Sequence, residues 1–131
     1  MTDLTTDSKG TWFPGARYGM FVHYGLFSQL ERGEWVMNRE RLSRGEMRRL
    51  AERFDPSRFD ADALCDLAVA GGMRYVNLTT MHHEGFRLYD TERTDVNAAH
   101  YTGRDLVAEF VGAARQRGLR ITLDHSLNNW T

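Results

Sequence analysis

Side chains that could do chemistry recur in this sequence just after short apolar segments. They are histidines and carboxylates, namely His23, His82, His83, Glu84, Asp124 and His125. Neutral imidazole offers one hydrogen-bond donor and one acceptor, which suits the hydroxyl groups of a sugar. His82 and His83 are adjacent, and neighbouring side chains at a strand end point in different directions, so both can reach one site. We therefore predict a polar binding site; the fifth histidine, His100, falls in a predicted loop.

Aromatic side chains could complete such a site. Trp12, Trp35, Trp130 and Tyr24 offer flat apolar surfaces against which the C–H face of a sugar ring packs. Ordinary packing in the core or in loops is the alternative for each of them.

A metal site is the main competing interpretation, because His23, His82, Asp124 and His125 have suitable ligand chemistry. The sequence has no H-x-H at the end of the first apolar segment and no HExxH motif, so we predict neither metal nor cofactor. The sequence has no G-x-S-x-G motif for a serine nucleophile. Ser126 directly follows His125 and is therefore poorly placed to be activated by that histidine. The sequence also has no glycine-rich loop at a helix start, the usual element for binding phosphate.

Composition narrows the class of ligand. The chain has 131 residues, 41% of them hydrophobic, which fits one domain, with a net charge of −1 that favours neither nucleic acid nor an anionic membrane. The single cysteine, Cys65, excludes an internal disulfide and is predicted to be buried on a helix.

Residues 1–11 form a polar tail without a signal pattern, and no apolar run reaches about 20 residues, so we expect a cytosolic protein.

The elements that must position these side chains alternate in type. Short apolar segments predict strands at residues 17–23, 74–80 and 119–123. Helical periodicity predicts helices that begin at Ser43 and near Asp60, and a third from about Arg104 to Arg117. The order β, α, α, β, α, β indicates parallel pairing and an α/β fold. Ligands bind at the carboxyl edge of such sheets, where the histidines follow the strands.

Local signals mark where the helices begin and end. Ser43 and Glu46 have the spacing of a capping box, and Gly71 and Gly72 are expected to end the second helix. That helix is predicted to place Leu64, Leu67 and Ala68 on one apolar face.

Four stretches of the chain resemble the α-L-fucosidase family of glycoside hydrolases. The first is WFPGARYGMFVHYG, similar to the family's W-F-x-x-A-K-F-G-I-F-I-H-W-G; the second contains LTTMHHEGF, similar to T-T-K-H-H-D-G-F. EWVMNRE and GRDLVAEFVGAARQRGLRITLDHSLNNW resemble the segments that follow each of these. The resemblance covers residues 12–131 in the family's order, which we interpret as the N-terminal portion of a catalytic barrel.

The resemblance implies a (β/α)8 TIM barrel and a retaining mechanism that releases terminal α-L-fucosyl residues from glycans. A barrel of this type needs about 250 residues and eight strands, of which three are predicted here. The family's nucleophile lies on the fourth strand in a W-x-D segment and its acid/base lies further on. Both are therefore expected beyond Thr131, and the chain alone is expected to be inactive.

By the same resemblance, His23, His82 and His83 would hydrogen-bond the hydroxyl groups of fucose. Trp35 would line the pocket, and Asp124 stands where the family commonly has a tyrosine that contacts the sugar.

Four positions depart from the family pattern. Tyr24 replaces a tryptophan, Met81 a lysine and Glu84 an aspartate, and Asp124 places an anion where an aromatic hydroxyl is usual. The last change leaves the preferred sugar open.

Three further interpretations stay open. The chain could be a non-catalytic sugar-binding module, a metal-dependent barrel hydrolase, or an enzyme that uses Glu84 and Asp124, the only carboxylates predicted at the site, as a substitute pair. Three strands without the rest of a barrel leave two open edges, so we also expect self-association.

Overall fold

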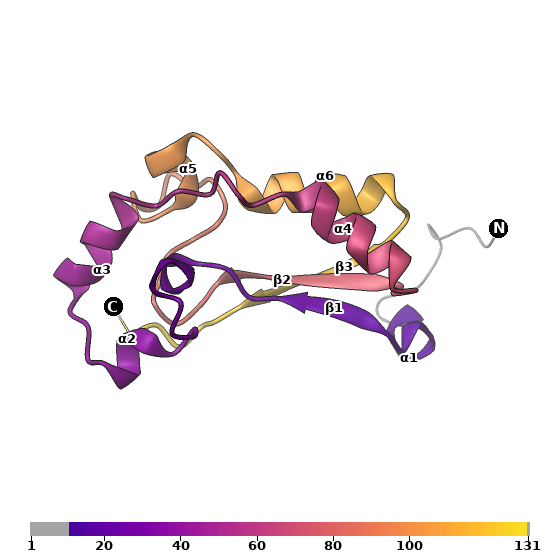
Figure 1. Cartoon of the computed structure of the whole chain (residues 1–131), viewed down its shortest axis with the longest axis horizontal. Helices are drawn as coiled ribbons and strands as arrows, with labels where there is room; N and C mark the ends of the chain where they lie inside the picture. Colours follow the sequence, from indigo (N-terminus) through magenta and orange to yellow (C-terminus); the bar gives the residue numbers. More distant parts are fainter. Residues whose placement is uncertain (1–10, 131) are drawn as a thin grey trace.

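The computed structural model describes residues 11–130, in which three parallel strands alternate with helices (Figure 1). The sheet has the order β1-β2-β3, with β1 at Gly19–Val22, β2 at Tyr75–Met81 and β3 at Arg120–His125. Both pairs of neighbours are parallel, as the sequence predicts. The polar tail predicted at residues 1–11 lies outside the described residues except for Thr11.

The predicted helices are present, with shorter bounds. They are α3 at Arg44–Ala51, α4 at Ala61–Ala70 and α6 at Leu106–Gln116. Four short elements were not predicted, namely α1 at Trp12–Ala16, the 3-10 helix η1 at Leu26–Leu30, α2 at Val36–Arg39 and α5 at Ala98–Thr102. Each has only four or five residues, too few for a helical period to be recognised in the sequence.

Side chains cap the predicted helices where the sequence indicates. The side chain of Ser43 accepts a hydrogen bond from the amide of Glu46, whose carboxylate returns one to the amide of Ser43, forming the expected capping box. Asp60 and Asp105 accept hydrogen bonds from the amides at the starts of α4 and α6. After α4 it is Gly72, with φ of 74°, that adopts the left-handed conformation.

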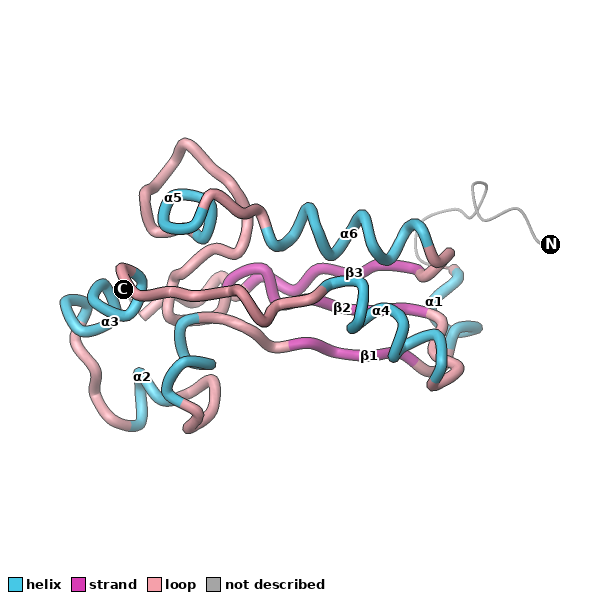
Figure 2. The backbone as a smooth tube through the Cα atoms, turned by 45° about the horizontal axis from the view of Figure 1, so that its top comes forward, coloured by secondary structure: helices cyan, strands magenta, loops and turns pink. Residues whose placement is uncertain are grey.

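The core lies between one face of the sheet and the two long helices. Figure 1 shows α4 and α6 on the same side of the strands, and Figure 2 shows α6 running along β3. Val76 and Leu78 of β2 are fully buried there, as are Cys65 of α4 and Phe110 of α6. Leu67 corrects the prediction, since its side chain is 62% exposed and α4 buries Ala61, Cys65 and Ala68 instead.

The opposite face of the sheet is more polar. Phe21 of β1, Asn77 of β2 and Thr122 of β3 are neighbours in the register, and the amide nitrogen of Asn77 donates to Oγ1 of Thr122 over 2.7 Å. Trp12 of α1 packs on Tyr75 at the amino end of this sheet, with ring centroids 5.8 Å apart. None of the helices within residues 11–130 is long and apolar enough to cross a membrane.

Candidate functional site

Three histidines meet at the carboxyl edge of the sheet. His23 follows β1, and His82 and His83 follow β2, which ends at Met81. The ring centroids of His23 and His82 lie 5.6 Å apart, and those of His82 and His83 lie 4.6 Å apart. Parallel pairing of β1 with β2 brings these ends together, as we inferred from the sequence.

Two tryptophans extend this group. Trp35, just before α2, packs on His83 with ring centroids 5.5 Å apart, while Trp130 stacks on His83 at 4.8 Å. The two indole rings are 5.0 Å apart in an edge-to-face arrangement. Figure 1 shows the yellow segment that follows β3 passing close to α2, and Trp35 lies directly before that helix. We call His23, His82, His83, Trp35 and Trp130 the histidine cluster.

Backbone contacts fix the orientation of His83. Its carbonyl oxygen accepts a hydrogen bond from the amide of Trp130 over 2.8 Å, and its Nδ1 lies 2.5 Å from the carbonyl oxygen of Asn128. A carbonyl oxygen can only accept, so Nδ1 of His83 must carry a proton. In the neutral ring Nε2 is then the free acceptor, suited to a sugar hydroxyl group.

His82 is the buried member of the cluster, with 6% of its surface exposed. Burial lowers its pKa from the ordinary value, and the neighbouring His83 and His23 lower it further, so the ring is neutral at pH 7. Its edge faces the ring of Phe27, a contact residue that no motif in the sequence indicated. Within residues 11–130 its Nδ1 has no hydrogen-bond partner. A buried ring nitrogen in this state is ready to bond an incoming group.

Asp124 lies beside the cluster at the end of β3. It pairs with Thr79 in the register, and together with Glu34 it raises the pKa of His82, an effect smaller than that of burial. The structure thus places Asp124 within electrostatic reach of the predicted site. His125 is placed differently, because its Nδ1 lies 3.1 Å from Oγ1 of Thr80 and its ring packs on Tyr89.

The structure corrects the expectation that Glu84 lies at the binding site with Asp124. Only 2% of its surface is exposed, and its carboxyl oxygens accept hydrogen bonds from the amides of Leu26 and Phe27 over 2.9 and 3.2 Å. Burial raises its pKa to about 8, although the two backbone hydrogen bonds oppose the shift. A Cβ at Gly25 would lie only 2.5 Å from this carboxyl group, which explains a glycine there. Glu84 therefore ties η1 to the loop after β2, and it does not face the sugar site as a catalytic partner of Asp124.

Two aromatic candidates also lie elsewhere. Tyr24 packs against Phe54 and Phe59, with ring centroids 5.9 and 5.1 Å away, and Trp12 lies at the amino end of the sheet. For these two the alternative of ordinary packing is correct. Among the described residues, no group of three or more His, Cys, Asp or Glu side chains is placed to hold a metal ion.

Comparison with known proteins gives one consistent result. A family model described as alpha-L-fucosidase matches residues 1–131. The chain is 35% identical to the tissue alpha-L-fucosidase of Bos taurus and 33% identical to that of Homo sapiens, in each case over 91% of this chain and 29% of the relative. The chain thus spans about 30% of the length of the curated relatives it matches.

Solved structures agree with these relatives. Alpha-L-fucosidase isoenzyme 1 from Paenibacillus thiaminolyticus superposes with a TM-score of 0.88 at 39% identity, over 91% of this chain and 28% of that one. An alpha-L-fucosidase from Lactobacillus casei in complex with alpha-L-fucose product gives a TM-score of 0.82 at 35% identity, over 88% of this chain and 40% of that one. The three parallel strands match the N-terminal part of these TIM-barrel structures, which confirms the predicted fold class.

Proposed function

Since the chain belongs to the α-L-fucosidase family, we propose that it is the N-terminal part of a retaining glycoside hydrolase that removes terminal α-L-fucosyl residues from glycans. The observation that carries this proposal is the histidine cluster at the carboxyl edge of parallel strands, where barrel enzymes bind their substrates. One of the matched structures holds α-L-fucose as a product.

In this proposal the cluster binds and orients the sugar. The rings of His82 and His83 exchange hydrogen bonds with hydroxyl groups, and His23 approaches from the end of β1. Trp35, with 42% of its surface exposed, offers an apolar ring to the C–H face of the sugar.

The chemical step needs two carboxyl groups, one as nucleophile and one as acid and then base. Glu84 is held by backbone amides, so we place both catalytic carboxylates on strands that follow β3 in the family's barrel. The chain by itself is then a substrate-binding part without turnover.

Asp124 bears on which sugar is bound. A carboxylate accepts hydrogen bonds and cannot donate them when ionised, so this position favours a hydroxyl-bearing carbon of the sugar over a methyl group. Fucose is proposed on the family match and on the fucose-bound relative, not on Asp124. Asp124 is the residue by which related sugars would be distinguished.

Binding and hydrolysis by the 131-residue chain test this proposal. Titration with L-fucose, followed by NMR, should shift signals of His23, His82, His83 and Trp35, and His82→Ala should abolish the shifts. His100→Ala is the matched control, because His100 packs on Tyr101 in α5. An aryl α-L-fucoside should not be hydrolysed.

Two outcomes would contradict the proposal. Absence of any fucose-induced shift in the folded chain would reject the sugar site. Turnover that is lost in Asp124→Asn would instead place catalysis within this chain.

A non-catalytic sugar-binding module is the second candidate, because the members of the cluster already contact one another within residues 11–130. Binding of fucose by this chain, together with absence of the W-x-D strand from the DNA downstream of codon 131, would favour it.

We also propose that the isolated chain self-associates through its open strand edges. Phe21 and Leu123 are 57% and 50% exposed on strands β1 and β3, which lie at the two edges of the sheet. The cytosolic location stays a prediction from the sequence.

A further inference from the structure

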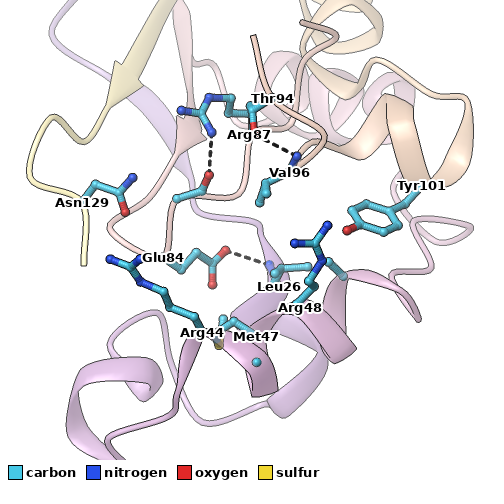
Figure 3. A pocket seen from close by; sticks show the side chains of 13 residues that line it. Leu26, Arg44, Met47, Arg48, Glu84, Arg87, Thr94, Val96, Tyr101 and Asn129 are labelled. Carbon is cyan, nitrogen blue, oxygen red and sulfur yellow. Dashed lines mark hydrogen bonds between the residues drawn. The ribbon is translucent and has the colours of Figure 1, made fainter. Parts of the chain in front are cut away.

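A cavity lies beside the buried carboxyl group of Glu84, and none of the residues that line it belongs to the histidine cluster. It has a volume of about 510 Å³ and is bounded by α3, the segment after β2 and α5 (Figure 3). Its apolar lining comes from Leu26, Met47, Ala51, Val96 and the ring of Tyr101. A ring-shaped ligand can pack against a lining of this kind.

Three arginines give this cavity its charge. Figure 3 shows Arg44 and Arg48 on the side of α3 and Arg87 on the opposite side, with Glu84 between them in the view. Arg44 makes no hydrogen bond or ion pair within residues 11–130, whereas Arg48 pairs with Asp95 over 2.7 Å. Arg87 uses Nη1 to bond the carbonyl oxygen of Gly85 over 3.0 Å. A guanidinium group carries five N–H donors, so most of these donors stay available to a ligand.

Glu84 at the base of the cavity does not cancel this charge. Its pKa of about 8 means that the buried carboxyl group is protonated at pH 7. Glu84 is the one acidic side chain among the residues that line the cavity, whereas three of them carry a guanidinium group. Asp95, which pairs with Arg48, lies outside this lining, so the balance of charge is positive. Arginine favours oxyanions such as carboxylate and sulfate, which it can bond in pairs.

The cavity and the histidine cluster share a stretch of backbone near the end of the described chain. Asn129 lines the cavity, and the next residue, Trp130, stacks on His83 of the cluster. Consecutive residues of the chain therefore contact the two sites.

We propose that this cavity, which we name the arginine pocket, binds the carboxylate or sulfate ester group of an acidic sugar. The oxyanion bonds Arg44 and Arg87, and the sugar ring packs on Tyr101 and Leu26. This inference takes one premise from the proposed function, namely that the ligand is a sugar. It adds acidic glycans to the class of substrates.

Calorimetric titration of the 131-residue chain tests the pocket with three probes. Glucuronate carries a carboxylate on a sugar ring, inorganic sulfate is an oxyanion without a ring, and glucose is a ring without an oxyanion. Glucuronate should bind at least about tenfold more tightly than either of the others, a difference that titration resolves readily. Equal binding of glucuronate and glucose would overturn the oxyanion site, and equal binding of sulfate and glucuronate would overturn the sugar-specific part.

Variants locate the binding. Arg44→Gln and Arg87→Gln should each weaken glucuronate binding by about tenfold or more. Arg49→Gln is the matched control, since Arg49 lies on the same helix, outside the residues that line the cavity, and should change binding less than about twofold. An equal loss in Arg49→Gln would show attraction by diffuse charge and reject the pocket. Loss of L-fucose binding in His82→Ala, with glucuronate binding intact, separates this site from the proposed fucose site.

Discussion

The two faces of the three-stranded sheet differ in how far their side chains are buried and hydrogen-bonded within this chain. On the face toward α4 and α6, Val76 and Leu78 are fully buried in an apolar core. On the other face Phe21 is 57% exposed, and within residues 11–130 Oδ1 of Asn77 and Oγ1 of Thr79 are buried without hydrogen-bond partners. The helix-covered face therefore contributes the apolar core, whereas the other face, at whose carboxyl edge the histidine cluster lies, is partly exposed and carries polar atoms without partners among the described residues.

The difference has an energetic meaning. A buried polar group without a partner costs about 1–3 kcal/mol, while a fully buried Leu or Val contributes about 1.5–3 kcal/mol by leaving water. The unpaired atoms of Asn77, Thr79 and His82 therefore reduce stability where the site lies. A ligand or a further polypeptide segment that bonds them would stabilise the chain.

The largest expected effect tests the helix-covered face. Leu78→Ala removes a fully buried side chain between β2 and the helices and should lower the free energy of unfolding by about 2–5 kcal/mol. Denaturation with urea measures the change. Phe21→Ala, on the exposed face, is the control and should change stability by less than about 1 kcal/mol. Equal losses in the two variants would show that both faces are packed alike.

The next effect concerns the buried carboxyl group of Glu84, which lines the arginine pocket. The pKa of Glu84 rises from 4.5 to about 8, so the folded state holds its proton more tightly than the unfolded chain does. The contribution of Glu84 to the free energy of unfolding should be greatest below pH 4.5. It should fall as the pH rises toward 8, by at most about 1.4 kcal/mol per pH unit. Urea denaturation from pH 5 to pH 8 measures the slope.

Glu84→Gln should remove this slope, because an amide does not titrate. Glu46→Gln is the matched control at an exposed helix start. Hydrogen bonds from Ser43 lower the pKa of Glu46, so its contribution is present above the ordinary pKa and is lost as pH falls, the opposite direction. A slope that persists in Glu84→Gln would assign it to another group.

A smaller effect is expected at the start of α4, which covers the packed face. Asp60→Ala removes the side chain that accepts from the amide of Ala63 over 2.9 Å, and should cost about 1 kcal/mol. Thermal unfolding measures the change, and Asp60→Asn should restore most of the loss because asparagine also caps helices. No difference between the two variants would mean that the cap contributes nothing.

The smallest effect on stability is expected for a variant that reduces self-association of the chain. Phe21→Ser removes an exposed ring from the edge strand β1, so it should leave the unfolding free energy within about 1 kcal/mol while reducing self-association. Sedimentation velocity at several concentrations of chain measures this. A monodisperse unaltered chain at all concentrations would reject association through the open edges.

Much of the fold was determined by local sequence. The strands were predicted from short apolar runs, and the starts of α3 and α4 from Ser43 and Asp60, because capping depends on residues only three positions apart. The grouping of His23 with His82 also followed from the sequence, since parallel strands bring their carboxyl ends to one edge. The role of these histidines in binding sugar stays a prediction.

Only the tertiary structure decided which side chains face the site and which support it. Glu84 is one residue from His83, yet it is directed to the amides of Leu26 and Phe27, 58 and 57 positions earlier in the chain. Trp130 joins the cluster, whereas Trp12 packs at the other end of the sheet. Residue type and spacing along the chain cannot make these distinctions, because burial and hydrogen bonding depend on neighbours that the fold brings from distant parts of the sequence.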